Sequence, residues 1–428
     1  MTDKSKLYNN IDEPQERVVL VGVASGSEEE AERSVEELAL LAKTAGAKVV
    51  GKAIQNKDSI DPVSYVGKGK ISEIAAACDE LEADTIICDD ELNGSQIRHI
   101  SEMTGRKVID RTLLILDIFA QRAVSAEGKM QVELAQLKYR YSRLSGMGRS
   151  LSRLGGGIGT RGPGETKLET DRRHINRRIG YIKNALKQTG VRRDRIRGAR
   201  RESDAVTIAV VGYTNAGKST LINVLCESNL YAENKLFATL DATARRLPFS
   251  EGVDVVLMDT VGFIRKLPHQ LIEAFNSTLE EIADADMIMH VVDTSDPDMT
   301  RHMEIAEELL GRLKATSKPR ITVFNKIDVK GFEDVPYDPA FNTKDGTVIP
   351  VSAHTGEGIG YLLEELKQIA KAGNVSVRLY IPYSDAGALD HCRKYGTVAN
   401  VSYEDDCITA DVLLPRSRLP KVSAYMIK

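Results

Sequence analysis

The sequence has no tryptophan, only 5% aromatic residues, and five scattered cysteines without a C-x-x-C spacing. This cysteine pattern excludes a disulfide framework and a cysteine-based zinc site, so we expect buried free thiols. The sequence also lacks an apolar run of the roughly 18 residues that a membrane span needs. Residues 1–14 lack the basic start and apolar core of a secretory signal. We therefore expect a cytoplasmic protein without a membrane span, associated at most peripherally with larger structures.

The charge of the chain is unevenly distributed. The 428 residues, 42% of them hydrophobic, carry a net charge of −4. Residues 138–201, however, contain 19 Lys and Arg against 4 Asp and Glu, a local charge of +15, so the rest of the chain carries −19. Charge of one sign over such a span repels itself unless an anionic partner neutralises it. The segment therefore predicts contact with a polyanion.

Alternating strand-like and helix-like stretches divide the chain into four expected parts. We predict an α/β domain over residues 1–117, a basic helical hairpin over 118–201, a doubly wound, mostly parallel α/β domain over 202–372, and a small α/β module over 373–428. The expected helices of the first part are Glu28–Ala45 and Ile71–Leu81. The expected strands are Val18–Val23, Ala47–Ala53, Thr85–Cys88, Lys107–Asp110, Thr207–Val211, Val253–Met258, Met287–Val292, Ile321–Phe324, Thr347–Val351, Val375–Ile381, Thr397–Tyr403 and Ile408–Leu413.

Two apolar heptad seams, separated by the glycine-rich residues 154–164, predict an antiparallel hairpin with a glycine-rich tip. The seams consist of Met130, Leu134, Leu137, Tyr141 and Leu144, and of Leu168, Ile175, Ile179, Ile182 and Leu186. Glycines permit close backbone approach and arginines suit phosphate, so we expect RNA binding through backbone and shape, with strong salt dependence. A solvated charged coil is the alternative. The predicted RNA contacts are Arg149, Arg153, Arg161, Lys167, Arg172, Arg173, Arg177 and Arg178.

A phosphate-binding loop follows the first strand of the third part. Its sequence, GYTNAGKST, matches G-x-x-x-x-G-K-[ST] and leads into a helix that starts near Leu221. The glycines let backbone N–H groups converge on phosphates, and the helix N-terminus favours anions. We expect Lys218 to reach the β- and γ-phosphate oxygens and Ser219 to offer its hydroxyl to Mg²⁺. The predicted nucleotide contacts are Gly212, Tyr213, Thr214, Asn215, Ala216, Gly217, Lys218, Ser219 and Thr220.

A later motif, NKID, indicates guanine. It follows a strand, so that Asp328 can accept hydrogen bonds from the ring N1–H and the exocyclic amino group of guanine, neither of which adenine presents. A site built on such bonds can reject the wrong base by roughly 10⁴–10⁵. We therefore expect GTP rather than ATP, with Ser352 and Ala353 contacting the guanine oxygen and His354 giving packing or polar support. The predicted base contacts are Asn325, Lys326, Ile327, Asp328, Ser352, Ala353 and His354.

A switch motif, DTVG, follows the strand before it. Asp259 can hold the magnesium shell and the Gly262 N–H can sense the γ-phosphate. A threonine hydroxyl from the preceding loop can complete the shell; we predict Thr239, and Thr243 is the alternative because only spacing separates the two. The switch and loop residues predicted to contact nucleotide are Phe237, Ala238, Thr239, Leu240, Asp241, Asp259, Thr260, Val261 and Gly262. The predicted metal ligands are Ser219, Thr239 and Asp259, and the predicted catalytic residues are Lys218, Thr239, Gly262 and Asn215.

Together the motifs FATLD, DTVGF, NKID and VSAHTGEGI resemble those of the HflX family in the translation-factor class of GTPases. The rest of the chain agrees, through YVGKGK, DDEL, VIDRT, QVELAQLKY and SRLGGGIGTRGPGETKLETDRR. The resemblance implies a P-loop GTPase domain and binding to the large ribosomal subunit and its rRNA. It also implies stimulation of hydrolysis there and the splitting or rescue of stalled ribosomes. We expect a monomer.

Two residues of the site bear on the rate of hydrolysis. Phe263 follows the switch glycine, where Ras-type enzymes have a glutamine that orients the attacking water. A phenyl ring cannot hydrogen-bond water, so we expect slow intrinsic hydrolysis, on the order of 10⁻⁴ s⁻¹, and orientation by a partner such as the ribosome. Asn215 matches the asparagine of GTPases that place K⁺ where an arginine finger acts in others, which predicts stimulation by K⁺.

Two other functions remain open: a GTP-dependent switch that recruits a protein partner through the hairpin, and a nucleotide-driven RNA remodeller working from the N-terminal domain. No Walker motif lies in that domain. Gly67–Lys70, before a helix, predicts either an anion site or a plain glycine turn. Asp89–Glu91, after a strand, predicts either a metal site or helix capping.

Overall fold

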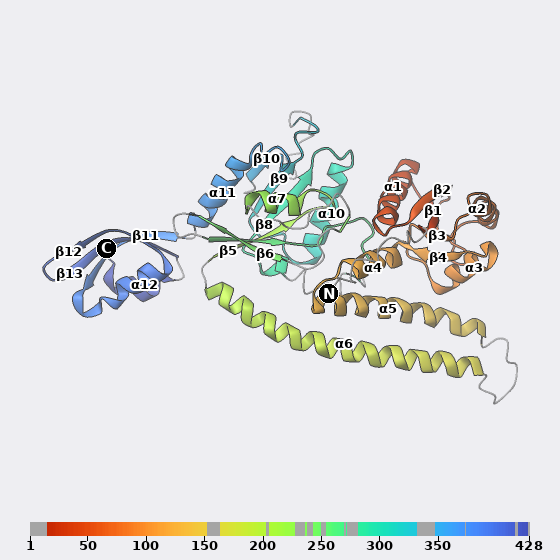
Figure 1. The fold of residues 1–428 in the computed structure, drawn as a ribbon, viewed down its shortest axis with the longest axis horizontal. Coiled ribbons are helices and arrows are strands. Elements are labelled where there is room, and N and C mark those ends of the chain that lie inside the picture. The colour runs from red at the N-terminus through yellow and green to blue at the C-terminus, as the bar shows by residue number, and fades with distance from the viewer. Residues whose placement is uncertain are drawn as a thin grey trace, which may run out of the picture. The chain divides into compact units, whose positions relative to one another are not determined.

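The computed structural model forms two compact units, Met1–Leu186 with Arg265–Ala274, and Lys187–Ile264 with Phe275–Lys428. Each unit is built around a sheet of parallel strands (Figure 1). No helix in the described part of the chain has the length and apolar character that a membrane crossing requires. The described residues are 15–151, 163–202, 205–226, 236–237, 243–249, 254–268, 271, 281–331, 347–372, 374–415 and 418–426.

The N-terminal sheet has the strand order β2-β1-β3-β4, with every neighbouring pair parallel. Its inner strands β1 and β3 are continuous buried apolar runs, as expected for strands covered on both faces. The strands are β1 (Arg17–Ala24), β2 (Lys48–Asn56), β3 (Thr85–Cys88) and β4 (Lys107–Asp110). The helices are α1 (Glu28–Thr44), α2 (Lys68–Glu80), α3 (Gly94–Thr104) and α4 (Arg111–Arg122).

The sequence predicts α1 and α2 but not α3 and α4. Helix α3 is short and opens on glycine, yet the side chain of Asn93 caps it in a capping box with Gln96. Helix α4 follows β4 without a turn residue, and its apolar run does not distinguish a strand from a buried helix. The alternative that Asp89–Glu91 caps a helix is wrong, because Asn93 is the cap.

The hairpin consists of α5 (Ala126–Leu151) and α6 (Pro163–Glu202). The two helices lie side by side and antiparallel (Figure 1), and Arg178 donates to both carboxylate oxygens of Glu133, at 2.7 and 2.9 Å. On α6, Ile182 is buried and Ile175 and Ile179 are half-buried, so the predicted seam faces inward.

The second unit contains a six-stranded sheet of order β10-β9-β8-β5-β7-β6. All neighbours are parallel except the edge pair of β6 and β7, and β6 is not predicted from the sequence. The strands are β5 (Val206–Val211), β6 (Thr243–Pro248), β7 (Asp254–Asp259), β8 (Met287–Asp293), β9 (Arg320–Asn325) and β10 (Thr347–Pro350). The helices are α7 (Lys218–Leu225), α10 (Met299–Arg312) and α11 (Ile359–Ala372).

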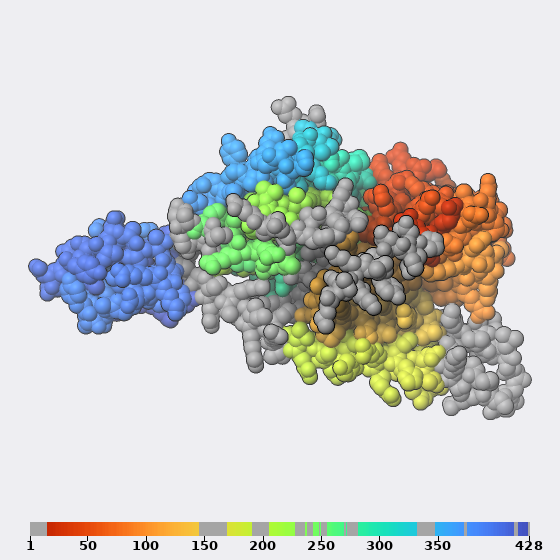
Figure 2. Space-filling model, viewed as in Figure 1, coloured from red at the N-terminus to blue at the C-terminus, as the bar shows by residue number. Residues whose placement is uncertain are grey.

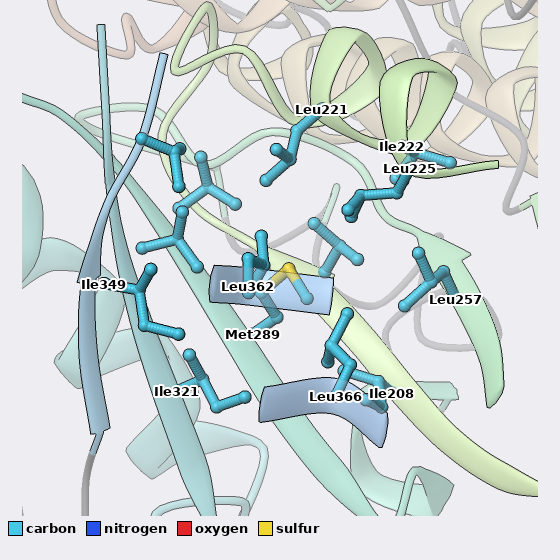
Figure 3. Close-up of a cluster of buried hydrophobic side chains, with 14 of the residues drawn as sticks. Ile208, Leu221, Ile222, Leu225, Leu257, Met289, Ile321, Ile349, Leu362 and Leu366 are labelled. Carbon is cyan, nitrogen blue, oxygen red and sulfur yellow. The ribbon is translucent and has the colours of Figure 1, made fainter. Parts of the chain in front are cut away.

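Apolar side chains cover both faces of this sheet. Figure 3 shows Leu221 and Leu225 of α7 and Leu362 of α11 turned toward side chains of the strands, among them Met289 and Ile321. A second cluster on the opposite face joins Met299 and Met303 of α10 to Val292 and Phe324. Neighbouring strand residues thus alternate between two layers, which holds the ends of the strands in fixed positions.

A small C-terminal sheet completes the chain. Its order is β11-β13-β12, both pairs are antiparallel, and its own core includes Leu379, Leu389 and Cys392. The elements are β11 (Asn374–Pro382), η4 (Tyr383–Asp385), α12 (Gly387–Tyr395), β12 (Thr397–Tyr403), β13 (Cys407–Pro415), α13 (Leu419–Val422) and η6 (Ser423–Tyr425).

Candidate functional site

The loop between β5 and α7 has the backbone shape of a phosphate cradle. Its φ angles are positive at Gly212 (151°), Asn215 (64°) and Gly217 (91°). A Cβ at Gly212 would lie 2.2 Å from the Val291 carbonyl oxygen, and one at Gly217 would lie 2.3 Å from Asn325 Nδ2. Only glycine fits these two positions, which explains the spacing of the motif.

Lys218 lies at the start of α7, with its side chain buried. Its Nζ donates to the carbonyl oxygens of Gly212, at 3.0 Å, and Tyr213, at 2.8 Å. Burial lowers the pKa of Lys218 to about 8, and the charge of Asp259 opposes that shift. Charged phosphate oxygens are stronger acceptors than carbonyls, so this ammonium is placed to exchange its partners for a triphosphate.

Two hard oxygen donors meet beside the lysine. Ser219 Oγ donates to Asp259 Oδ2 at 2.7 Å, and Asp259 is fully buried at the end of β7. Adjacent ligands of an octahedral Mg²⁺ lie roughly 2.9 Å apart, given Mg–O distances of about 2.0–2.1 Å. The pair therefore fits two neighbouring positions of a magnesium shell.

The third predicted ligand, Thr239, lies outside the described residues together with Ala238, Leu240 and Asp241. Its alternative, Thr243, begins β6 opposite Asp259 in the antiparallel ladder. The hydroxyl of Thr243 is buried without a hydrogen-bond partner in the described part of the chain. Both threonines thus stay candidates. Phe237 is buried and has a positive φ of 55°.

The switch motif is bound to the phosphate loop through its backbone. Phe263 N–H donates to Gly212 O at 3.0 Å, and Thr214 N–H donates to Phe263 O at 2.8 Å. Thr260 Oγ1 donates to Val210 O at 2.7 Å, and Val261 is buried. A Cβ on Gly262 would lie 2.8 Å from Thr214 Cγ2 and 3.1 Å from Lys218 Nζ. The switch glycine therefore lies next to Lys218, the residue predicted to bind phosphate.

The base-recognition motif is joined to the phosphate loop by one amide. Asn325 Nδ2 donates to Ala216 O at 2.9 Å, and Asn325 Oδ1 accepts from Ala353 N–H at 3.0 Å. Ser352 Oγ donates to Asp328 Oδ1 at 2.6 Å, which fixes the carboxylate predicted to read guanine. The structure thus brings the NKID and SAH motifs together, although they are far apart in the sequence.

Three other predicted contacts surround this group. Lys326 has a positive φ of 68°, and its Nζ donates to Asp293 Oδ2 at 2.6 Å. Ile327 N–H donates to Val351 O at 3.4 Å. The His354 side chain is 88% exposed, with Nδ1 3.9 Å from Asp328 Oδ2, which favours polar support over packing. The last contact of the phosphate loop, Thr220, lies in the first turn of α7.

Sequence reasoning missed several residues that build the site. Asp293 orients Lys326, and its place at the end of β8 was the available signal. Tyr213 stacks on His302 of α10 with ring centroids 3.6 Å apart, a contact that spacing alone does not reveal. His290 is buried, and burial followed by the charges of Arg320 and Lys218 lowers its pKa to about 3.

Some of the predicted RNA contacts lie in the described part of α6, and the others lie outside the described residues or have side chains outside them. Arg173, Arg177 and Arg178 are exposed on α6, which forms an outer surface in the space-filling view (Figure 2), whereas Arg172 is half-buried. Arg173 pairs with Glu169 at 3.1 Å, and Arg178 pairs with Glu133. Arg153 and Arg161 lie outside the described residues, and the side chains of Arg149 and Lys167 are also outside them.

Comparisons with known proteins match most of the chain. Family models described as "GTP-binding GTPase N-terminal", "GTP-binding GTPase Middle Region" and "50S ribosome-binding GTPase" match residues 32–120, 122–200 and 207–326. The "GTPase HflX" of Lacrimispora saccharolytica is 49% identical over 403 residues, covering 94% of this chain and 94% of that protein. The chain belongs to the HflX family.

A second HflX relative, from Caldanaerobacter subterraneus, is 46% identical over 395 residues, covering 92% of this chain and 90% of that protein. A solved structure described as "SsGBP and GDP complex" is 24% identical and covers 83% of this chain and 99% of that one, with a TM-score of 0.48. The HflX chain described here is a GTPase, and its predicted α/β fold with a P-loop GTPase domain is confirmed.

Proposed function

We propose that this HflX GTPase binds the large ribosomal subunit through rRNA and uses GTP binding and hydrolysis to split or rescue ribosomes. The observation that carries the proposal is the charge of the hairpin, because residues 138–201 hold 19 cationic against 4 acidic side chains. The description of the matching GTPase family model, "50S ribosome-binding GTPase", supports the same partner. Contacts to phosphates by exposed arginines such as Arg177 position a protein without reading sequence.

We assign the steps of hydrolysis to the residues around the phosphate loop. Lys218 binds the β- and γ-phosphate oxygens, and the Gly262 N–H binds the γ-phosphate. Ser219, Asp259 and a threonine, Thr239 or its alternative Thr243, would hold Mg²⁺, whose positive charge would offset the charge that develops on the transferred group. Asp328, oriented by Ser352, selects guanine. Asn325 and Ala353 hold the base-recognition loop against the phosphate loop.

The same assignment implies that hydrolysis needs a partner. The Phe263 side chain is buried and cannot hydrogen-bond the attacking water. Its backbone N–H and carbonyl groups are both hydrogen-bonded to the phosphate loop, so Phe263 does not orient the water, and we assign this role to a group outside the chain. The ribosome is the partner we propose for this role, and K⁺ near Asn215 is a second source of positive charge.

The proposal is tested by measuring GTP turnover with and without large ribosomal subunits. The wild-type protein is compared with a variant lacking residues 155–164 and with Lys218→Ala. We expect subunits to accelerate the wild type, the deletion variant to keep its basal rate but lose the acceleration, and Lys218→Ala to lose both. Equal rates with and without subunits for the wild type would contradict the proposal and favour recruitment of a protein partner.

A further inference from the structure

The carboxyl ends of β1 and β3 form an acidic crevice, by which we mean Glu37, Asp89 and Asp90. The strand order β2-β1-β3-β4 reverses direction between β1 and β3. In open α/β sheets, ligands bind at such a reversal, outside the carboxyl ends of the strands. The acidic crevice therefore occupies the position where this type of domain holds a ligand.

One cation is built into the crevice. Arg111 is buried, with a side chain only 2% exposed, and its Nη2 lies 2.7 Å from Asp89 Oδ1 and its Nη1 2.9 Å from Glu37 Oε2. Ser34 Oγ also donates to Asp89 Oδ2, at 2.7 Å. Asp90, which accepts from the Tyr65 hydroxyl at 2.8 Å, adds a further negative charge beside Asp89, and this charge favours a second cation.

That second cation comes from the segment that follows the switch motif. Lys266 Nζ donates to Asp89 Oδ2 at 2.5 Å and to Asp90 Oδ1 at 2.6 Å, and Arg111 Nη1 donates to the Arg265 carbonyl oxygen at 3.4 Å. Lys266 adopts a positive φ of 53°, which is uncommon for a residue other than glycine. Arg265–Ala274 belongs to the same compact unit as the N-terminal sheet.

The chain segment between Lys266 and the switch residues bound to the phosphate loop is short. Phe263 is hydrogen-bonded to the phosphate loop, and Lys266 follows only three residues later. Each residue spans at most about 3.6 Å, so roughly 11 Å of chain at most connects Phe263 to Lys266. Switch segments of GTPases change their arrangement when the γ-phosphate binds. The γ-phosphate contact of the Gly262 N–H therefore acts on the same short segment that Lys266 anchors.

We propose that Lys266 in the acidic crevice is a clamp that holds the switch segment in its position without γ-phosphate. Lys266 is a positioning residue, which acts on the nucleotide only through Gly262, and GTP must weaken its contacts with Asp89 and Asp90. The inference rests on the γ-phosphate contact of Gly262 in the proposed function, but it needs neither the ribosome nor the hairpin.

The clamp is tested by the affinities of the full-length protein for GDP and for a non-hydrolysable GTP analogue, without ribosomes and in magnesium buffer. Lys266→Met keeps the length of the side chain and removes its charge. We expect it to raise the affinity for the analogue at least threefold and to leave the affinity for GDP within twofold. Asp90→Asn should act in the same direction, and the double variant should add nothing to the larger single effect.

The matched control is Lys314→Met. Lys314 is an exposed lysine with nearly the same backbone conformation, φ 56°, and no salt bridge within the described residues. An unchanged ratio of analogue to GDP affinity in Lys266→Met overturns the clamp. The clamp is also overturned if Lys314→Met changes this ratio as much as Lys266→Met does. It is overturned as well if the effects of Lys266→Met and Asp90→Asn on the ratio simply add in the double variant. Gly262→Ala distinguishes a failure of the proposed γ-phosphate contact from a failure of the clamp. If this variant keeps its affinity for the analogue, the γ-phosphate contact of Gly262 is wrong. If it loses that affinity while Lys266→Met leaves the ratio of analogue to GDP affinity unchanged, only the clamp is wrong.

Discussion

Single side chains set the selectivity of the site. Asp328 is held by the Ser352 hydroxyl, and Asn325 is held from both sides by backbone groups. Polar groups that are held in place in this way reject a ligand that leaves them without hydrogen bonds. At this scale, a change of one atom type is expected to change the ligand.

Asp328→Asn replaces one acceptor oxygen by a donor. Hydrogen bonds to a charged group contribute about 1.5–3 kcal/mol each, so losing the two expected bonds to guanine weakens GTP binding by roughly 10²–10⁴-fold. Xanthosine triphosphate, which carries an oxygen in place of the exocyclic amino group, should regain affinity for the variant. Titration of both nucleotides against both proteins measures the exchange. A variant that still prefers GTP would contradict the assigned role of Asp328.

Asn215 is exposed at the positive-φ position of the phosphate loop. If it helps to place K⁺, GTP turnover should be about tenfold faster in K⁺ than in Na⁺ buffer, equivalent to about 1.4 kcal/mol of transition-state stabilisation. Asn215→Ala should remove the difference while GDP affinity stays unchanged. Equal wild-type rates in the two salts would remove this idea.

His290 ties stability to pH. Burial and nearby cations lower its pKa from 6.5 to about 3, so below pH 6.5 the unfolded state binds more protons than the folded state. The contribution of His290 to stability is therefore complete above pH 6.5 and decreases as the pH falls toward 3, by up to about 1.4 kcal/mol per unit. Chemical unfolding at several pH values should show this decrease in the wild type and a flatter profile in His290→Gln. Identical slopes would contradict it.

At the scale of elements, the sharp exit from β5 places the phosphate loop. Gly212 brings its backbone against β8, where no side chain fits. The loop can therefore bend directly from the strand into the helix. Helix α7 begins at Lys218, directly after the loop, and its apolar face packs on the sheet (Figure 3).

Two glycine-to-alanine changes in the same domain should have opposite effects. At Gly212 an added Cβ meets the Val291 carbonyl oxygen at 2.2 Å in a positive-φ conformation, so Gly212→Ala should reduce the free energy of unfolding by about 2 kcal/mol or more and abolish GTP binding. Gly360 in α11 has open space around it, so Gly360→Ala should increase stability by about 0.5–1 kcal/mol. Denaturant unfolding and GTP titration test both variants.

The sequence predicts those elements whose local pattern matches their environment. Buried parallel strands such as β3 and β4 coincide with the predicted ranges, and the phosphate loop is predicted residue by residue because its glycines have one physical explanation. The pairing of Asn325 with Ala353 and of Lys266 with Asp89 depends on which distant loops meet, and no local pattern contains that information. The metal-ligating threonine stays undecided for the same reason.

For the whole molecule, the separation of charge matters more than its sum. A chain with net charge −4 carries +15 in one segment, and Arg173, Arg177 and Arg178 are exposed on α6. Attraction to a polyanion is therefore local to the hairpin, while the acidic remainder opposes unspecific binding elsewhere.

Arg177 tests this view. Arg177→Gln should weaken binding to large ribosomal subunits, and it should reduce the slope of log K against log salt concentration by roughly 0.7–0.9 if the arginine contacts one phosphate. Glu133→Gln, which weakens the pair with Arg178 and removes no predicted RNA contact, is the control for a change in hairpin packing. Co-sedimentation at several salt concentrations gives both slopes. An unchanged slope for Arg177→Gln would show that this side chain touches no phosphate.

The amide of Asn325 has a consequence for how a nucleotide is sensed. One side chain restrains both the turn that receives phosphates and the turn that receives the base, so ordering either turn lowers the entropic cost of ordering the other. The two halves of a nucleotide are thus thermodynamically linked through the protein. A nucleoside alone or a free polyphosphate captures only part of this cooperativity, which protects the enzyme from the abundant fragments of its own substrate.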